Sequence, residues 1–196
     1  MNLVFYKKLL IFASLSKIII MNKRILAITA IIFTAAFLRL IPHAPNFSPI
    51  GAIALFGGAF LNRKYLAYLI PFLALFISDI FLGFYGMSML VTYGAFACSI
   101  YIGSMLRKKL TWYNTAFASV FSSVVFFLIT NLVFFYPEST GLYTHDLAGL
   151  VNCYAAGLPF FQNTLASDLV YSILFFGSFY LLNVNIPSLQ AQKIKA

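Results

Sequence analysis

Charged side chains are scarce in this chain. Asp, Glu, Lys and Arg together make up 9% of the 196 residues, and the acidic residues number four. Soluble domains contain about 25% charged and roughly 45–50% apolar residues, whereas 62% of this chain is apolar. Because so few charges cannot shield that much apolar surface from water, the composition excludes a soluble enzyme. The 18% aromatic content excludes a disordered chain, which leaves a membrane-embedded protein of one domain.

Cysteine and histidine are equally rare. Cys98 and Cys153 form no CxxC pair, so they predict neither a disulfide framework nor a metal site. His43 and His145 both fall in expected loops, and the chain contains no GxxxxGK[ST], HExxH or GxSxG motif. We therefore expect no catalytic residues, no metal, no cofactor and no ATP site, and we expect that the protein is not an enzyme.

Basic residues greatly outnumber acidic ones. Thirteen Lys and Arg against four Asp and Glu give a formal charge of +9. In a soluble protein this excess would favour nucleic acid as a partner. In membrane proteins, however, basic residues mark the cytoplasmic loops. We therefore expect the lipid bilayer as the partner, and no nucleic acid.

Six apolar segments separated by short polar breaks predict six helices. The predicted helices are residues 25–41, 50–61, 65–82, 87–106, 114–136 and 161–182. A proline-rich hinge, residues 42–49, follows the first segment, and a longer connection, residues 137–160, precedes the last. A membrane helix needs about 20 residues, with a lower limit of about 17. The second segment is therefore the doubtful one.

The positions of the basic clusters decide whether the second segment crosses. All of them lie on one side of the membrane if all six segments cross; they are Lys23-Arg24, Arg63-Lys64, Arg107-Lys108-Lys109 and Lys193 with Lys195. If residues 50–61 formed a re-entrant loop instead, two of these clusters would lie outside, against the positive-inside rule. We predict an all-α membrane protein with six transmembrane helices and both termini in the cytoplasm, in the bacterial inner (plasma) membrane.

The N-terminal 20 residues are interpreted separately. They are apolar but interrupted by Lys7, Lys8 and Lys17, and they contain no clean run long enough to span. Residues 1–20 are therefore an extension from an upstream start site or an interfacial amphipathic segment. A cleaved signal peptide is less favoured, because Lys17 breaks the apolar core and no small-x-small site follows. Residues 21–184 form the predicted membrane domain, and residues 185–196 a cytoplasmic tail.

Three ionisable residues fall within the predicted spans: Arg39, Asp79 and Asp168. With a helical rise of about 1.5 Å per residue, all three lie in one layer in the outer third of the bilayer. Arg39 cannot neutralise both carboxylates. The surplus favours a polar pocket open to the outside, in which water, a proton or a ligand completes the set. The alternative is a structural Arg–Asp pair at a helix junction.

Other polar residues extend this candidate site. His43 and Asn46 lie in the hinge, and three residues near the charged layer are Tyr93, Asn131 and Asn163. With Arg39, Asp79 and Asp168, they are the candidate substrate-binding residues.

The second segment is also rich in small residues. Ala54 and Gly58 stand in a small-xxx-small relation, which lets helix backbones approach closely. This spacing indicates either internal packing of a short helix or a docking face for a partner.

Several stretches carry a family resemblance. They are RLIPHAPNFSPIGA at residues 39–52, Ser78-Asp79 followed by Gly83-Phe84-Tyr85, and YAAGLPFFQNT at residues 154–164. Over most of residues 24–182 the chain resembles an uncharacterised bacterial family to which membrane transport is ascribed. More distantly it is similar to the substrate-binding S components of energy-coupling-factor vitamin transporters. That resemblance implies an S-component-like bundle of six helices, with a substrate site near the outer surface capped by the loop after the first helix.

The resemblance implies a function, with one departure. S components commonly carry an AxxxA motif on the first helix for docking the energising subunit, whereas Ala30 with Thr34 is the nearest approach here. The expected function is binding of a small vitamin-like or cationic solute from the outer side and participation in its uptake. An ATPase and transmembrane coupling module, or a homo-oligomer, is the expected partner. The alternative is a structural or scaffold protein of an envelope complex with no solute of its own.

Overall fold

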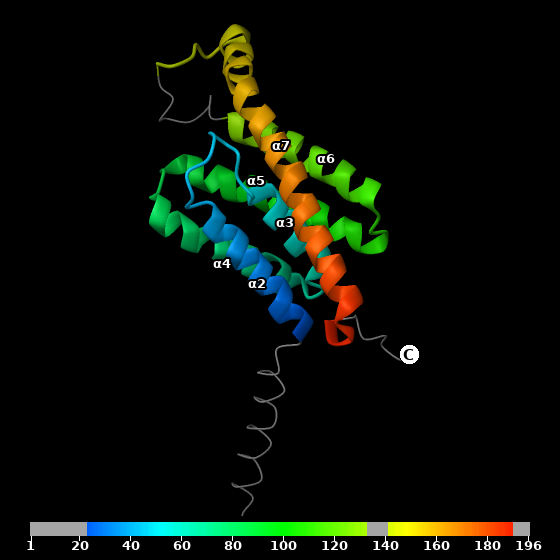
Figure 1. The fold of residues 1–196 in the computed structure, drawn as a ribbon. Coiled ribbons are helices and arrows are strands. Elements are labelled where there is room, and N and C mark those ends of the chain that lie inside the picture. The colour runs from blue at the N-terminus through cyan, green and yellow to red at the C-terminus, as the bar shows by residue number, and fades with distance from the viewer. Residues whose placement is uncertain (1–22, 133–140, 190–196) are drawn as a thin grey trace, which may run out of the picture.

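The computed structural model describes residues 23–132 and 141–189, which form six α-helices and two short 3-10 turns with no β-strand (Figure 1). The α-helices are α2 (Lys23–Leu38), α3 (Ile50–Phe60), α4 (Lys64–Leu82), α5 (Met87–Met105), α6 (Trp112–Thr130) and α7 (Leu147–Asn185). The turns are η1 (Leu106–Lys108) and η4 (Pro187–Leu189). The all-α prediction is confirmed for this part of the chain. The interpretation of residues 1–20 lies outside the described residues.

The predicted bounds of the first four helices agree with the structure within three residues, whereas the fifth, predicted to end at residue 136, ends at Thr130 as α6. The first helix is shorter than predicted, because α2 ends at Leu38 although the apolar run continues to Ile41. The amides of Arg39, Leu40 and Ile41 each bond the carbonyl three residues earlier, which tightens the last turn. A residue before proline disfavours the helical conformation, so Pro42 accounts for the end of the helix.

The predicted connection at residues 137–160 is wrong from Leu147 onward, because α7 begins there and continues for 39 residues. The Asp146 carboxylate caps the helix by accepting a hydrogen bond from the Gly149 amide at 2.7 Å. The helix continues through Pro159. At about 1.5 Å per residue, α7 is about 58 Å long, and its first turns project beyond the other helices (Figure 1).

Four helical segments are long and apolar enough to cross a membrane: Lys64–Leu82, Met87–Lys108, Trp112–Thr130 and Leu147–Asn185. The chain therefore has the character of a helical membrane protein. With 16 and 11 residues, α2 and α3 are shorter. They extend about 24 and 16 Å at the usual helical rise.

The short helix α3 lies at the centre of the bundle. It packs against α2, α4, α5, α6 and α7. Every residue between Gly51 and Ala59 is buried, and only Ile50 and Phe60 at its ends are partly exposed. A helix that is apolar on all sides belongs in a core, and α3 consists of glycine, alanine and larger apolar residues throughout.

Two glycines allow α3 and α5 to approach closely. A Cβ added to Gly58 would overlap the backbone carbonyl of Ile100, and one added to Gly103 would overlap the backbone of Leu55. Ala54 is completely buried in the same core. Internal packing is therefore confirmed as the role of the small-residue pattern in this segment.

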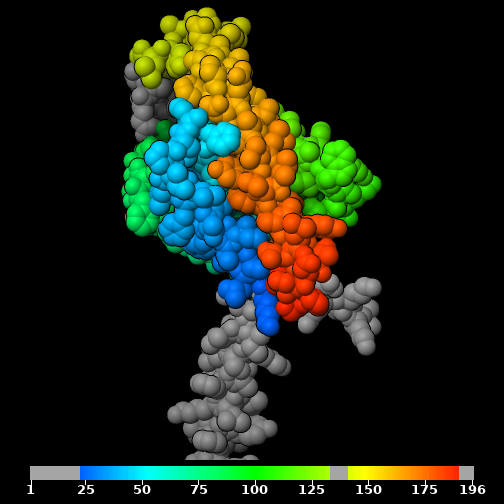
Figure 2. Space-filling view, viewed as in Figure 1, coloured from blue at the N-terminus to red at the C-terminus, as the bar shows by residue number. Residues whose placement is uncertain are grey.

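Aromatic rings join α3 to the C-terminal half of α7. The Phe56 ring meets those of Phe176 and Phe179 edge-on, with centroids 5.5 and 5.7 Å apart. The Phe60 and Phe179 centroids lie 4.5 Å apart. Offset and edge-on ring pairs are the favourable geometries, so this cluster fixes α7 along the core. Earlier along α7, the cyan segment after α2 lies against the orange part of this helix (Figure 2).

Arginines gather at one end of the bundle. Arg24 of α2 donates to the Leu189 carbonyl at 2.9 Å, and its guanidinium lies 5.2 Å from the centre of the Phe179 ring. Arg107 donates to the Gly58 carbonyl at 2.7 Å. The start of α2 therefore meets the ends of α3, α5 and α7 at this basic end. The hinge and the starts of α3 and α5 lie at the opposite end.

Candidate functional site

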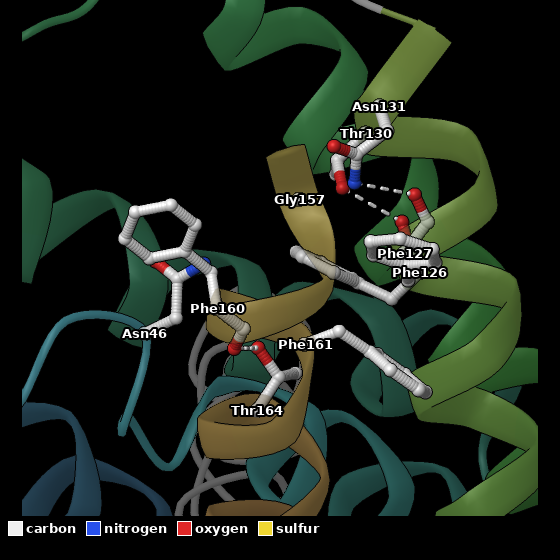
Figure 3. A pocket seen from close by; sticks show the side chains of 9 residues that line it. All are labelled: Asn46, Phe126, Phe127, Thr130, Asn131, Gly157, Phe160, Phe161 and Thr164. Carbon is white, nitrogen blue, oxygen red and sulfur yellow. Dashed lines mark hydrogen bonds between the residues drawn. The ribbon is translucent and has the colours of Figure 1, made fainter. Parts of the chain in front are cut away.

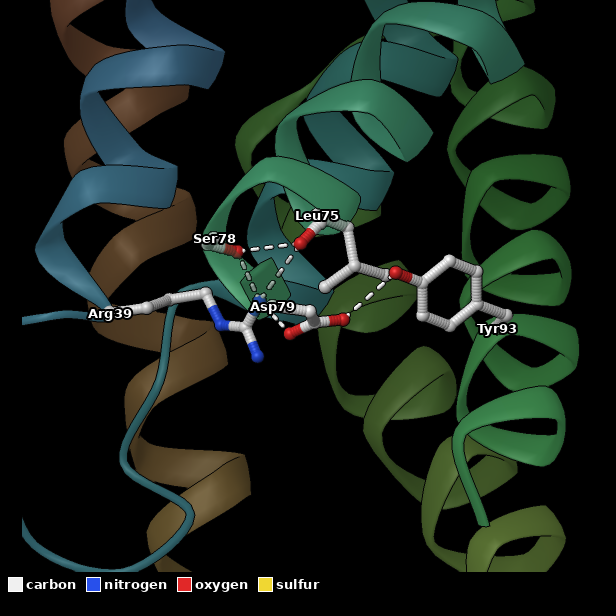
Figure 4. A network of polar contacts seen from close by, with 5 residues as sticks. All are labelled: Arg39, Leu75, Ser78, Asp79 and Tyr93. Atoms are coloured by element: carbon white, nitrogen blue, oxygen red, sulfur yellow. Dashed lines mark hydrogen bonds and ion pairs between the residues drawn. The ribbon is translucent and has the colours of Figure 1, made fainter. Parts of the chain in front are cut away.

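Arg39 and Asp79 form a buried ion pair. Arg39 follows the last residue of α2, and Asp79 lies in the last turn of α4. The Nη1 atom of Arg39 is 2.8 Å from Oδ1 of Asp79, and their side chains are 8% and 0% exposed (Figure 4). This is the Arg–Asp pair that the structural alternative expected.

Neighbouring polar groups complete this charged network. Arg39 Nη1 also donates to the Ser78 hydroxyl and, at 3.5 Å, to the Leu75 carbonyl. Tyr93 of α5 donates its hydroxyl to Asp79 Oδ2 at 2.9 Å. Both carboxylate oxygens of Asp79 are thus engaged, and α2, α4 and α5 are joined at the end opposite the arginine cluster.

Asp168 occupies a different place and has different partners. It lies on α7 with 1% exposure, and its Oδ2 accepts a hydrogen bond from Ser123 of α6 at 2.6 Å. A Cβ on Gly51 would overlap this carboxylate, and the amides of Gly51 and Ala52 lie close enough to act on its charge. A helix N-terminus stabilises an anion through its partial positive charge. The start of α3, rather than an arginine, therefore faces Asp168.

A cavity of about 280 Å³ opens beside Asp168. Its walls come from the hinge, the start of α3, the α4–α5 loop, α5, α6 and α7. The lining residues are Asn46, Ser48, Ile50, Gly51, Tyr85, Thr92, Phe126, Thr130, Thr164 and Asp168.

A second hollow of about 100 Å³ adjoins the first and shares four of its lining residues. Figure 3 shows its wall, in which Phe126 and Phe127 of α6 lie near Phe161 of α7, while the Phe160 ring lies beside Asn46. The combined space has a carboxylate in one part and aromatic rings in the other.

Two buried polar atoms at the larger cavity lack hydrogen bonds. Asp168 Oδ1 and Ser48 Oγ have no hydrogen-bond partner among the residues that the structure describes, and both residues line the cavity. Buried polar atoms in native proteins nearly always have a partner, either protein or water. An occupant of the cavity is therefore placed to form hydrogen bonds with these two atoms.

The hinge is fastened over the cavity by α7. Asn163 donates to the Pro45 carbonyl at 2.9 Å, and Ser167 donates to the Ser48 carbonyl at 3.1 Å. Between these two points, Asn46 adopts φ 61°, a left-handed conformation in which asparagine is enriched. This turn places Asn46 against both the larger cavity and the smaller hollow.

The eight predicted site residues separate into groups. Asn46, Asn131 and Asp168 line the cavity or its aromatic extension. Arg39, Asp79 and Tyr93 form the ion-pair network instead. Asn163 fastens the hinge, and His43 is exposed and lines neither hollow.

Tyr85 connects the two groups. It lines the cavity from the α4–α5 loop. Burial raises the pKa of its phenol, and the nearby negative charge of Asp79 raises that pKa further. The network and the cavity are therefore neighbours, although Asp168 makes no ion pair within the described part of the chain.

Sequence reasoning missed the hydroxyl groups at the cavity wall. They belong to Ser48, Tyr85, Thr92, Thr130 and Thr164, and Ser123 behind the wall was missed as well. Serine and threonine inside helices often bond the carbonyl of the preceding turn, so their presence in a span gives no signal of a site. Tyr85 stood in the quoted Gly83-Phe84-Tyr85 motif, which was the available signal.

Comparison with known proteins gives one match. A search of curated proteins and a search of solved structures found no match to the chain. A family profile described as "Family of unknown function (DUF6580)" matches residues 20–189. The match contains all six described helices together with the hinge and the cavity. The chain belongs to this family of unknown function.

Proposed function

We propose that this protein binds a small solute in the cavity beside Asp168 and takes part in its uptake across the bacterial inner membrane. The observation that carries the proposal is the pair of buried, unbonded polar atoms, Asp168 Oδ1 and Ser48 Oγ, at one cavity. Intramembrane carboxylates in transport proteins commonly mark substrate or ion pathways. The position of the cavity under the loop after the first helix supports the proposed S-component-like arrangement.

The proposed topology has six crossings with both termini in the cytoplasm. Arg24 and Arg107 lie at the same end of the bundle, which the positive-inside rule assigns to the cytoplasm. The cavity then opens toward the outside. A length of 11 residues does not prevent α3 from crossing, because protein surrounds it, and irregular backbone such as the hinge is tolerated at membrane depth where protein buries it.

A partner would supply the energy for uptake. The sequence has no phosphate-binding loop of the GxxxxGK[ST] type, and the six helices of the described residues leave little material for a moving second half. We therefore propose that an ATPase and transmembrane coupling module, or a second copy of the chain, completes the transporter.

Solute-dependent stabilisation tests the proposal. The purified protein in lipid nanodiscs would be unfolded thermally in the presence of vitamins, amines and small cations, one at a time. A ligand present at 100 times its Kd stabilises the folded state by about 2.7 kcal/mol. We expect at least one compound to raise the Tm of the native chain.

A matched pair of variants assigns the effect to the cavity. Thr164→Phe places a ring in the cavity and should abolish the stabilisation. Val170→Phe places the same ring on the same helix at a position 45% exposed, and should preserve it. If no compound stabilises the native chain, or if both variants respond alike, the proposal fails.

The scaffold alternative has its own supporting observation. Both oxygens of Asp79 are engaged, and Asp168 contacts Ser123 and the start of α3, so each buried carboxylate also joins helices. A scaffold predicts that Asp168→Asn lowers stability while no solute raises the Tm of the native chain. Solute binding predicts the Tm increase and its loss in the variant.

A further inference from the structure

We infer that the cavity selects an organic cation, namely a protonated amine attached to a flat apolar group. This inference rests on the proposed function and names the class of solute. Three features of the wall support this inference: its charge, the direction of its hydrogen bonds, and the separation of its lining into a part with the carboxylate and a part with aromatic rings.

The wall carries one carboxylic acid and no basic side chain. Among the described residues that line either hollow, Asp168 is the single ionisable acid, and there is no Lys, Arg or His. The nearest arginine named in the polar network, Arg39, is already paired with Asp79. The start of α3 supplies roughly half a positive charge to Asp168, so the wall is net negative when Asp168 is ionised and then disfavours an anion.

The hydrogen bonds of the wall leave acceptors facing the cavity. Thr130 and Thr164 donate their hydroxyl hydrogens to the carbonyls of Phe126 and Phe160, at 2.9 and 3.2 Å. Asn131 likewise donates through Nδ2 to the Phe127 carbonyl at 2.9 Å. The side-chain oxygens of these three residues therefore keep lone pairs that can accept hydrogen bonds from an occupant.

An ionised carboxylate is also an acceptor without a hydrogen to donate, and Asp168 Oδ1 has no partner among the described residues. These acceptors fit an occupant that donates several hydrogen bonds. An ammonium group offers three.

The size and lining of the space favour an organic cation over a bare metal ion. A cavity of about 150 Å³ accommodates benzene, and the larger hollow measures about 280 Å³. The adjoining hollow is bordered by the Phe127 and Phe161 rings, whose centroids lie 4.7 Å apart. An amine directed at Asp168 would therefore place its apolar part against these rings.

Three compounds of similar shape and different charge test the inference. They are 2-phenylethylamine, 2-phenylethanol and 3-phenylpropanoate, each titrated at pH 7 into the protein in nanodiscs, with Tm and Kd as readouts. We expect the amine to bind at least tenfold more tightly than the alcohol and the carboxylate to be excluded. Sodium chloride and potassium chloride are tested at equal ionic strength, because an increase in Tm with either salt would indicate a site for a bare cation.

Variants assign the preference to the cavity residues. Asp168→Asn should reduce the amine's affinity to that of the alcohol. Ser48→Ala should weaken the amine several-fold and leave folding intact, because the Ser48 hydroxyl bonds no described residue. Ser48→Ala also keeps the test informative if Asp168→Asn does not fold. Asp146→Asn, at an exposed acid away from the cavity, is the matched control and should leave the amine's affinity unchanged.

The outcomes separate this inference from the proposed function. The inference is overturned if the alcohol or carboxylate binds as tightly as the amine, if neither cavity variant weakens the amine, or if sodium or potassium alone stabilises the protein. It is also overturned if the phenyl compounds fail and the solute found in the wider screen is neutral or anionic. Solute binding would survive each of these results. If no compound in either screen binds, both proposals fail.

Discussion

Replacing Arg39 should destabilise the protein mainly through the carboxylate that it leaves behind. Asp79 is 0% exposed and lies 2.8 Å from Arg39 Nη1. Removing one partner of a buried ion pair typically costs about 3–5 kcal/mol, because the other charge stays buried. Tyr93 continues to donate to Asp79 Oδ2, and a hydrogen bond to a charged group contributes about 1.5–3 kcal/mol. We therefore expect Arg39→Gln to cost about 3 kcal/mol, the low end of the range.

The double variant distinguishes charge from packing. Asp79→Asn in the Arg39→Gln background removes the buried charge and leaves two amides that can pair. A coupling energy of about 2 kcal/mol should be recovered, within the range of contacting residues in double-mutant cycles. Unfolding by sodium dodecyl sulfate in mixed micelles, followed by circular dichroism, measures all four free energies.

An exposed arginine provides the control. Arg63 is exposed and donates to the Tyr65 hydroxyl, which is also at the surface. Arg63→Gln should change stability by less than about 0.5 kcal/mol. The reasoning is refuted if the double variant is no more stable than Arg39→Gln alone, since the lost stability would then come from packing.

Three further predictions concern packing, topology and pH. Gly58→Ala should cost about 1–3 kcal/mol, because its methyl group would overlap the α5 backbone; Gly177→Ala, which meets open space, should be neutral or mildly stabilising in the same unfolding assay. With both native cysteines replaced by serine, Leu142→Cys should react with an impermeant thiol reagent in intact cells and Asn62→Cys should not; labelling at position 62 would contradict the six-crossing topology. The Gly149 amide and the Thr144 hydroxyl lower the pKa of Asp146 by hydrogen bonding to its carboxylate. The stability that this carboxylate adds to the start of α7 is therefore fully present above the ordinary carboxyl pKa of 3.8 and is lost as pH falls through the lowered pKa. The protection factors for hydrogen exchange in the first turn of α7 should therefore fall at acid pH, and Asp146→Ala should remove that pH dependence. An unchanged profile in the variant would show that another group titrates.

Composition by itself determined the class of this protein. A chain with 62% apolar and 9% charged residues has to place its surface in lipid, and only helices or closed barrels satisfy the backbone there. The uninterrupted apolar runs then located α4 and α5 nearly to the residue. The rarity of charges inside those runs identified Arg39, Asp79 and Asp168 as residues that require partners.

Tertiary structure decided which partner each charge has. Arg39 could have paired with either carboxylate, and the packing of α2 against α4 gives it Asp79. Asp168 instead meets Ser123 and the start of α3, because glycine at position 51 leaves room for its carboxylate. Contacts such as these join residues 40 or more positions apart, and the spacing of residues along the chain does not encode them.

The sequence also did not show which face of each helix is buried. In a soluble protein the polar side of a helix reveals which side is buried, whereas here the lipid-facing and core-facing sides are both apolar. Nothing in the run at residues 50–61 showed that α3 would be the central helix. Nor did the serines and threonines show which of them line a cavity, since their hydroxyls bond their own helices in either setting. In lipid the surface and the core of a protein are both apolar, so the sequence does not distinguish them. Only the packing of whole helices decides which faces are buried.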